Sequence, residues 1–504
     1  MLSEQDKVHD LFVIGGGING AAIACDAASR ALSVALAEMQ DFAQGTSSRS
    51  SKLAHGGLRY LETFDFRLVR EALVEREILM AKAPHLVRPL RLILPHVASQ
   101  RPRWMISLGL FLYDHLARRR VLKRSQPLNL RKHMVGKPLK DDYRHAFAYS
   151  DCRADDARLV IANLLSAQRH RAKILARHRF MSARREKGLW RVEVRDPDGD
   201  VQVVSARALV NAGGPWVIDV AGKIEGIQTA RKLRMVRGSH LVVPRQWIGE
   251  HGYFLQTRDR RLIEALPYES DFTLIGTTDE PWEDDPAKVA ISEKEIDYML
   301  GEVNAFLKRP VQRADIVWSF SGIRPLFEVG ATRDGDLSTL TRDYSFEVDK
   351  PDGEAPALTI FGGKLTTHRR LAEHAMRELA KIMRWPKTCA TAAEVLAGGE
   401  FGVRGLDGFR ADFRSRHAWL NERQANRYVQ TYGTRAEDLL AGCTRLADLG
   451  RHFGHDLYER EVRFLMETEW AVAAEDVLWR RTKLGLRLSH DEIRQLDVFM
   501  GHYG

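Results

Sequence analysis

The chain has 504 residues, of which 44% are hydrophobic and 29% charged, as is typical of a water-soluble protein with two or three domains. Its 4 cysteines show no CxxC pair and no metal-ligand spacing, so we expect reduced thiols and no metal site. The sequence shows neither the pattern of a signal peptide nor an apolar run long enough to span a membrane. The net charge of +10 favours an anionic partner, and the lack of a nucleic-acid-binding signature argues against DNA or RNA.

The first predicted unit binds a dinucleotide. A short apolar strand over residues 10–14 runs into a turn that contains Gly15, Gly17 and Gly20, and the next strand ends on Glu38. These glycines allow a tight turn, a close approach of the backbone to a pyrophosphate, and packing of the following helix on the strand. Glu38 stands near the position where a carboxylate binds a ribose hydroxyl. The complete order of strand, turn, helix, strand and acid predicts an adenine dinucleotide as cofactor.

The next segment, residues 44–60, departs from an NAD-binding domain, which would continue with regular βα units. It is rich in serine and glycine, so the loop can lie flat against a large planar or phosphorylated ligand. The alternative is a flexible linker, but a linker has little use for His55, Arg59 and Tyr60 around a glycine pair.

A charged helix is predicted over residues 66–83, followed by prolines that end the nucleotide-binding part. Residues 101–113 are apolar and are followed by basic residues up to position 124. This pattern fits a helix at a membrane interface and equally a helix packed in a substrate domain, and both interpretations stay open.

From position 155 the pattern alternates between helices and strands. The predicted elements are a helix from 155, a hairpin of strands 190–194 and 201–204, a buried strand from 206 that ends at Gly213, β-rich segments 236–245 and 253–278, a helix over 288–309, a strand over 318–324, and a strand over 357–361 with a helix to about 384. Residues from about 390 onward indicate helices, for which packing, dimerisation and membrane docking are all open roles.

Together these motifs resemble the FAD-dependent glycerol-3-phosphate dehydrogenases of the bacterial aerobic type. The resemblance spans nearly the whole chain and rests on residues 13–20, 46–48, 51–53, 55–60, 322–326 and 361–367. Two residues depart from the family pattern: Arg49 stands where a small residue is expected, and His368 where a tyrosine is expected.

The resemblance implies oxidation of sn-glycerol 3-phosphate to dihydroxyacetone phosphate at a bound FAD, with electrons passed on to a membrane quinone. It also implies a peripheral location on an anionic membrane surface, at the cytoplasmic face of the inner membrane; a homodimer is left open. The expected cofactor contacts, besides Gly15, Gly17, Gly20 and Glu38, are Thr46, Ser47, Ser48, Lys52, Leu53, Gly213, Gly363, Lys364, Leu365 and Thr366.

We therefore predict an α/β fold in which an FAD-binding Rossmann-like domain is interleaved with an antiparallel-sheet substrate domain, followed by an α-helical C-terminal domain. The FAD-binding domain comprises residues 1–85, 150–235 and 320–388, the substrate domain residues 86–149 and 236–319, and the helical domain residues 389–504.

The expected catalytic cations are Arg324 and Lys364, which follow strand ends beside glycines and can stabilise charge on the substrate oxygens and the reduced flavin. A dianionic phosphate calls for arginine, and the candidates are Arg59 with its neighbour Tyr60, and Arg342.

His55 and His240 are the candidates for the general base, because an imidazole titrates near neutral pH. A water molecule or the substrate phosphate are alternatives. Thr278, at the end of a predicted strand, is expected to line the substrate pocket.

Three other functions compete with this one. An amine or amino-acid oxidase would need a carboxylate clamp rather than several cations, and a flavin-binding sensor need not keep Arg59, Arg324 and Lys364 together. An NAD-linked dehydrogenase would continue the doubly wound pattern that this chain lacks.

Overall fold

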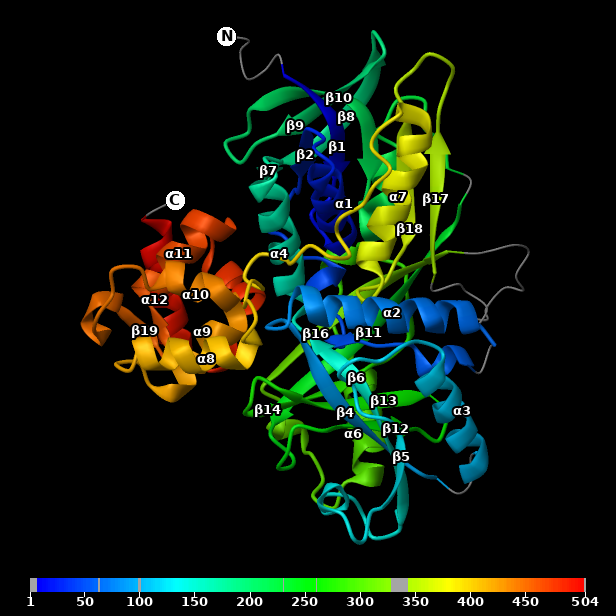
Figure 1. The fold of residues 1–504 in the computed structure, drawn as a ribbon, viewed down its shortest axis with the longest axis vertical. Helices are drawn as coiled ribbons and strands as arrows, with labels where there is room; N and C mark the ends of the chain where they lie inside the picture. Colours follow the sequence, from blue (N-terminus) through cyan, green and yellow to red (C-terminus); the bar gives the residue numbers. More distant parts are fainter. Residues whose placement is uncertain are drawn as a thin grey trace.

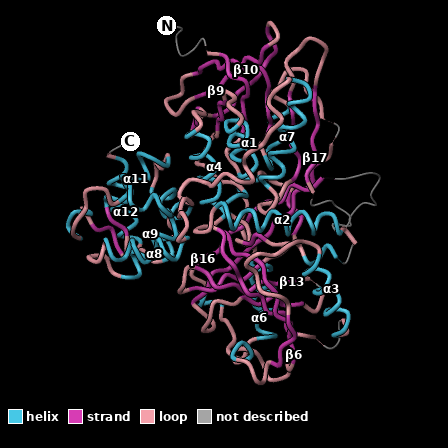
Figure 2. The backbone as a smooth tube through the Cα atoms, in the orientation of Figure 1, coloured by secondary structure: helices cyan, strands magenta, loops and turns pink. Residues whose placement is uncertain are grey.

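The computed structural model describes residues 7–61, 64–97, 101–229, 231–259, 261–327 and 343–502. Its two large sheets lie one above the other along the long axis of the molecule, and a helical domain lies beside them, as Figure 1 shows. Figure 2 shows that helices and strands alternate in the upper body, whereas strands dominate the lower one. The predicted α/β class is therefore confirmed.

The first sheet is built around β1 (Val8–Ile14), which pairs in parallel with β2 (Val34–Ala37) on one side and β10 (Val201–Asn211) on the other. Residues 11–14, the last four of β1, are all apolar and buried, as parallel strands covered on both faces require. The sheet is completed by β7 (Lys173–Leu175), β8 (Arg179–Glu186), β9 (Leu189–Arg195), β17 (Tyr344–Asp349) and β18 (Ala357–Gly362).

Three helices pack together on this sheet: α1 (Ile18–Ser29), α4 (Asp156–Arg169) and α7 (His368–Met383). Small residues of α1 such as Ala21 and Ala24 are fully buried, which lets the neighbouring helices approach closely. A short α5 (Val217–Ala221) follows β10.

Strand β10 differs from the prediction, because residues 201–211 form one continuous strand instead of two. Its first half pairs antiparallel with β9, and its second half pairs in parallel with β1. The residue pattern alone did not show that both pairings belong to one strand.

The second sheet is antiparallel as predicted, except that β12 and β4 pair in parallel. Its strands follow the order β15 (Glu280–Trp282), β11 (Leu233–Pro244), β14 (Phe272–Gly276), β13 (Leu262–Tyr268), β12 (Gly252–Gln256), β4 (Val87–Pro95), β6 (His145–Ala154) and β3 (Leu53–Ala54). Two further strands, β16 (Trp318–Phe327) and β5 (Gln126–Asn129), pair with β11 and β6. The associated helices are α2 (Phe66–Lys82), α3 (Arg103–His115) and α6 (Glu293–Phe306).

The chain crosses between the two sheets at places that differ from the predicted domain limits. Strand β6 continues past the expected limit at residue 150, and β16 places residues 320–327 in the second sheet. The pairing of β16 with β11 over ten residues explains the second difference, since a strand follows its ladder rather than a domain limit.

The C-terminal domain has its own hydrophobic core, built from residues such as Phe413, Tyr428 and Leu465. It comprises α8 (Gly405–Arg416), α9 (Glu422–Tyr432), α10 (Ala436–Leu439), α11 (Glu459–Glu469) and α12 (His490–Gly501), with a small hairpin of β19 (His452–Gly454) and β20 (Leu457–Tyr458). Among the described residues, we find no helix that is long and apolar enough to cross a membrane.

Candidate active site

The glycine-rich turn after β1 opens onto a long cavity of about 570 Å³. Gly15 has a φ of +104°, which glycine adopts without strain. A Cβ atom at position 20 would lie 2.0 Å from the carbonyl oxygen of Gly15, so only glycine lets α1 approach the turn. The structure thus supports the roles expected of Gly15 and Gly20, although Gly20 supports the turn from behind and does not line the cavity.

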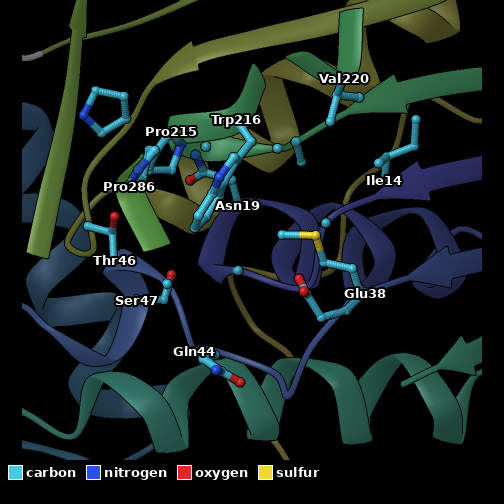
Figure 3. A pocket seen from close by; sticks show the side chains of 18 of the residues that line it. Ile14, Asn19, Glu38, Gln44, Thr46, Ser47, Pro215, Trp216, Val220 and Pro286 are labelled. Atoms are coloured by element: carbon cyan, nitrogen blue, oxygen red, sulfur yellow. The ribbon is translucent and has the colours of Figure 1, made fainter. Parts of the chain in front are cut away.

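Glu38 lies in the same cavity at the end of β2, at the right of Figure 3. Its two carboxylate oxygens accept hydrogen bonds from the backbone N–H of Gly16 at 2.7 Å and of Gln40 at 2.9 Å. Burial raises the pKa of Glu38, although these two bonds oppose the shift. The carboxylate is therefore held in a fixed orientation, with lone pairs left to accept ribose hydroxyls.

The serine-rich loop lies against the N-terminus of α1. The Ser47 hydroxyl accepts a hydrogen bond from the backbone N–H of Ile18 at 2.9 Å, and Thr46 donates to the carbonyl oxygen of Ile323 at 2.6 Å. Thr46 and Ser47 project into the cavity in Figure 3. The loop therefore ties the dinucleotide turn to strand β16 of the second sheet.

Asn19 is a cavity residue that the sequence reasoning missed. Its side-chain amide donates to the carbonyl oxygen of Gly362 at 3.0 Å and so connects α1 to the loop after β18. Its position directly before Gly20, the last glycine of the turn, was the available signal. The other predicted cofactor residues that line this cavity are Gly17, Gly213, Gly363 and Leu365.

Lys52 and Ser48 form one connected group with Asp156. The Lys52 ammonium is buried and donates to the Asp156 carboxylate at 2.8 Å and to the carbonyl oxygen of Ser48 at 2.5 Å. Neither residue lines the first cavity, and the cofactor contact expected of both stays a prediction. Asp156 also accepts from the Ser50 hydroxyl at 2.7 Å, and the pair holds the loop in place. Asp156 lies far from Lys52 in the chain, so the residue pattern could not reveal this ion pair.

A second cavity of about 280 Å³ continues from the first. Both cavities are lined by Thr46, Ser50, Pro325, Gly363 and Leu365, which mark where they meet. The second cavity also contains most of the residues expected to act on substrate: His55, Tyr60, His240, Arg324 and Lys364. Three residues expected to touch the cofactor, Leu53, Lys364 and Thr366, line this cavity rather than the first.

Arg324 and Lys364 supply positive charge to the second cavity. Arg324 forms an ion pair with Asp279 and donates to the Thr277 hydroxyl at 2.9 Å. The Lys364 ammonium lies 4.2 Å from the centre of the Tyr60 ring. A cation over an aromatic face is held without being neutralised, so Lys364 can still bind an anion.

The two histidines have different surroundings. His240 is 1% exposed, stacks on Phe320 and contacts the Ser51 hydroxyl through Nε2 at 3.0 Å. Burial, with smaller contributions from Arg324 and Lys52, lowers the pKa of His240 well below 6.5, so its ring is neutral at pH 7. His55 accepts a hydrogen bond at Nδ1 from the backbone N–H of Gly57 at 3.0 Å.

Thr278, Arg342 and Arg59 are the remaining residues expected to contact the substrate. Thr278 is buried and donates to Glu295 at 2.6 Å, while its neighbours Thr277 and Asp279 line the cavity, so the substrate contact expected of Thr278 stays a prediction. Arg342 lies outside the described residues, and the side chain of Arg59 is likewise not among those described.

Arg49 and His368, the two departures from the family pattern, lie in different surroundings. Arg49 lines the second cavity and donates to the carbonyl oxygen of Ser321 at 3.1 Å. His368 is buried at the start of α7, where Nδ1 contacts the carbonyl oxygen of Leu365 at 2.6 Å, and burial lowers its pKa to about 4.

Glu264 is a residue of the second cavity that the sequence reasoning did not single out. Burial is the main cause that raises its pKa to about 7, and a hydrogen bond with Ser51 opposes the shift. It stands in the middle of the apolar strand β13, and a charged residue in a buried strand was the signal that could have identified it.

Comparison with known proteins agrees with this geometry. The family model described as FAD dependent oxidoreductase matches residues 10–349, and the one described as C-terminal domain of alpha-glycerophosphate oxidase matches residues 389–497. The two-sheet body with its joined cavities is thus that of an FAD-dependent oxidoreductase.

Among relatives, a glycerol-3-phosphate dehydrogenase of Pseudomonas aeruginosa is 49% identical, covering 99% of this chain and 95% of the relative. A D-erythritol 1-phosphate dehydrogenase of Brucella abortus is also 49% identical, covering 97% of both chains. The solved glycerol-3-phosphate dehydrogenase of Bacillus halodurans in complex with FAD has a TM-score of 0.75 and 25% identity, covering 99% of this chain and 95% of that chain. The chain belongs to the family of FAD-dependent glycerol-3-phosphate dehydrogenases.

The first cavity fits FAD on its own features. The turn at Gly15 and Gly17 leaves room for a pyrophosphate, and the carboxylate of Glu38 is oriented for a ribose. Gly363 and the other residues that line both cavities would hold the flavin end of the cofactor, where it could face a substrate in the second cavity.

Proposed function

We propose that this chain oxidises sn-glycerol 3-phosphate to dihydroxyacetone phosphate. The observation that carries the proposal is one cavity, joined to the FAD cavity, into which Lys364, Arg324 and two histidines project. The cations suit a substrate with a dianionic phosphate, and a neutral imidazole suits the loss of a hydroxyl proton. The name of the Pseudomonas aeruginosa relative supports the same substrate.

FAD, when bound, supplies the acceptor for the hydride that leaves the secondary alcohol carbon. In this chain His240, which lines the cavity and has a neutral ring before the reaction, is our proposed acceptor of the hydroxyl proton, and His55 is the other candidate. Arg324 stabilises the negative charge that develops on the substrate oxygen. Arg59, Tyr60 and Arg342 stay predicted ligands of the phosphate, with Lys364 beside Tyr60.

The experiment that tests this function is anaerobic reduction of the purified holoenzyme. Adding sn-glycerol 3-phosphate should bleach the flavin absorbance, whereas glycerol and amino acids should not. Lys364→Ala should slow the bleaching strongly, while Lys381→Ala, which removes an exposed lysine of α7, should leave it unchanged. A flavin that stays oxidised with every phosphorylated polyol would refute the proposal.

A second candidate substrate is D-erythritol 1-phosphate. The observation that favours it is the Brucella abortus relative, which is as similar to this chain as the glycerol-3-phosphate dehydrogenase from Pseudomonas aeruginosa. The same bleaching assay with this phosphate measures which substrate is preferred.

We further propose that the electrons pass to a membrane quinone and that the protein docks on an anionic membrane surface at the cytoplasmic face. Helix α3 buries Ile106, Leu110 and Tyr113 but exposes a row of large apolar side chains. The exposed residues are Trp104 (65%), Met105 (42%), Leu108 (51%), Phe111 (57%) and Leu112 (37%). Basic residues follow the helix at positions 118–120, 123 and 124. Apolar and basic groups at one place suit the surface of an anionic bilayer.

Flotation with vesicles that contain anionic lipid tests the docking. The double variant Leu108→Ser and Phe111→Ser should stay unbound, while Val498→Ser, an exposed apolar residue of α12, should float like the wild type. Binding that is equal for both variants would exclude α3 as the docking surface. Light scattering on the purified protein tests the homodimer.

A further inference from the structure

Three residues lie side by side across one wall of the second cavity. Glu264 of β13 is directly opposite Gly276 of β14, and Gly276 is in turn directly opposite His240 of β11. Directly opposed residues project their side chains from the same face of a sheet, and both Glu264 and His240 line the cavity. This row therefore places an imidazole and a carboxylate on the same wall of the site.

The His240 ring lies over Gly276, the middle position of the row. A Cβ atom at position 276 would lie 2.2 Å from Cδ2 and 2.8 Å from Nε2 of the ring, so only glycine leaves room for it. The Nε2 edge of the imidazole is thereby turned toward Glu264. One face of the ring stacks on Phe320, with 4.8 Å between the ring centres. The ring is thus held in one orientation.

Ser51 connects the two titratable groups. Its hydroxyl lies 3.0 Å from Nε2 of His240 and is also hydrogen-bonded to Glu264. A hydroxyl has one proton to donate, and an ionised carboxylate can only accept. Ser51 therefore donates to Glu264 and accepts from Nε2–H, which leaves the lone pair of the neutral imidazole on Nδ1.

Nδ1 of His240 is shielded from solvent and has no hydrogen-bond partner among the residues that the structure describes. A buried acceptor without a donor is costly, and a substrate hydroxyl that donates to Nδ1 would satisfy it. The tautomer that Ser51 and Glu264 impose is therefore the one that can take a proton from a substrate.

The imidazole and the carboxylate differ in how tightly they hold a proton. Burial, the largest cause, lowers the pKa of His240 well below 6.5, and an imidazole with such a pKa is a weak base. Burial raises the pKa of Glu264 to about 7, and Oε2 of this carboxylate has no donor among the described residues. Glu264 is therefore the stronger base of the two.

We propose that Glu264 is the final acceptor of the substrate's hydroxyl proton, which reaches it from His240 through Ser51. This inference rests on the proposed function, in which His240 faces the reacting hydroxyl. Glu264 is then a positioning residue, because it acts on the substrate only through the imidazole, whose tautomer it sets and whose proton it stores.

The protons and electrons of this step balance. The substrate O–H bond breaks and its proton binds Nδ1 of His240, while the electron pair of the C–H bond leaves with the hydride that FAD accepts. The Nε2 proton moves to the Ser51 oxygen as the Ser51 proton moves to Glu264. His240 and Ser51 stay neutral, and Glu264 becomes a carboxylic acid.

Other charged and titratable groups face this chain of hydrogen bonds. Those around Glu264 are Arg324, Asp279, Asp151 and Tyr149, and those around His240 are Arg324 and Lys52. His55 lines the same cavity, and imidazoles and phosphate monoesters titrate in the range of about pH 5 to 8. All of these groups remain when Glu264 is replaced, so a pH dependence that only the variant loses belongs to Glu264.

The test is the pH profile of kcat/KM for flavin reduction by sn-glycerol 3-phosphate in the anaerobic holoenzyme. We expect the wild-type value to fall as the pH drops below about 7, since a protonated Glu264 cannot accept a proton. Glu264→Gln should lose this acidic limb, should be about 100-fold slower than the wild type at alkaline pH, and should approach it at acidic pH.

Ser51→Ala breaks the connection but keeps the carboxylate, so it should lose the same limb. The double variant Ser51→Ala and Glu264→Gln should be no slower than either single variant, because residues that act as one unit are not additive. If Glu264→Gln does not fold, Ser51→Ala decides the question. Glu250→Gln is the matched control, because this exposed carboxylate lines neither cavity.

A merely structural role of Glu264 would slow flavin reduction by the same factor at every pH, and profiles of that shape would overturn the inference. An acidic limb that persists in Glu264→Gln and in Ser51→Ala would also overturn it, because His55 or the substrate phosphate would then be its source, and the proposed function would stand. If sn-glycerol 3-phosphate leaves the wild-type flavin oxidised at every pH, the proposed function fails, and this inference falls with it.

Discussion

Arg481 of the C-terminal domain donates two hydrogen bonds to the carboxylate of Asp41, at 2.7 and 2.8 Å. Both side chains are fully buried, and Arg480 forms a further ion pair with the same carboxylate. Asp41 follows Glu38 and Gln40, which line the FAD cavity. The C-terminal domain therefore holds one wall of the cofactor site, a role that its amino-acid pattern did not reveal.

This pair predicts that the C-terminal domain supports FAD binding. Asp41→Asn should destabilise the protein by about 3 to 5 kcal/mol, because it removes the charge that pairs with the fully buried Arg481, whereas Arg480 keeps Asp476 as a partner. It should also speed the release of FAD, measured by the fluorescence of free flavin. Arg494→Gln breaks an exposed pair with Asp491 and should change neither quantity. An Asp41→Asn protein that retains FAD as the wild type does would contradict this role.

Lys52 gives a prediction that separates structural from cofactor roles. Lys52→Met should lower the free energy of unfolding by about 3 to 5 kcal/mol, since Asp156 would be buried and unpaired. The flavin spectrum and the KM of the folded fraction should stay as in the wild type. Lys381→Met, in an exposed pair with Glu378, is the control for charge loss. A shifted flavin spectrum in Lys52→Met would instead favour a direct cofactor contact.

Gly20→Ala should abolish FAD binding, because the added methyl group would collide with the backbone of Gly15. Gly301→Ala in α6, where the added methyl group meets nothing within 4 Å, should leave FAD content unchanged and stabilise the helix by up to about 1 kcal/mol. Absorbance of bound flavin per protein measures both. Full FAD content in Gly20→Ala would show that the turn can shift.

Glu264 should make stability depend on pH. Its pKa is about 7 in the folded protein and near 4.5 when unfolded, so the folded state holds the proton more tightly. The resulting stabilisation is complete below pH 4.5 and is lost as the pH rises to 7. Glu264→Gln should therefore be more stable than the wild type at pH 8, by at most about 3 kcal/mol, and similar to it at pH 4.5. Urea unfolding at both pH values measures the difference, and a gain that does not vary with pH would exclude this titration.

Much of the fold could be predicted from the sequence, because its signals are local. The turn at Gly15 to Gly20 follows from backbone sterics, and the helix of α4 and the hairpin at Asp198 follow from periodicity and turn residues. Lys364 could be identified because it follows the end of β18 beside glycines, whereas Arg324, which was also predicted at a strand end, lies inside β16.

The tertiary structure alone decided which of these residues meet. Lys52 is bound by Asp156 and Asp41 by Arg481, partners that lie far apart in the chain, and no local pattern specifies such a pairing. Glu264 became a site residue only when strand register placed it in one row with His240. The sequence by itself determined the cofactor turn, since backbone geometry at glycines is local, and it predicted Arg324 and Lys364 as catalytic cations. The depth of the substrate cavity and the support of the cofactor loop depend on packing between distant segments, which only the folded chain decides.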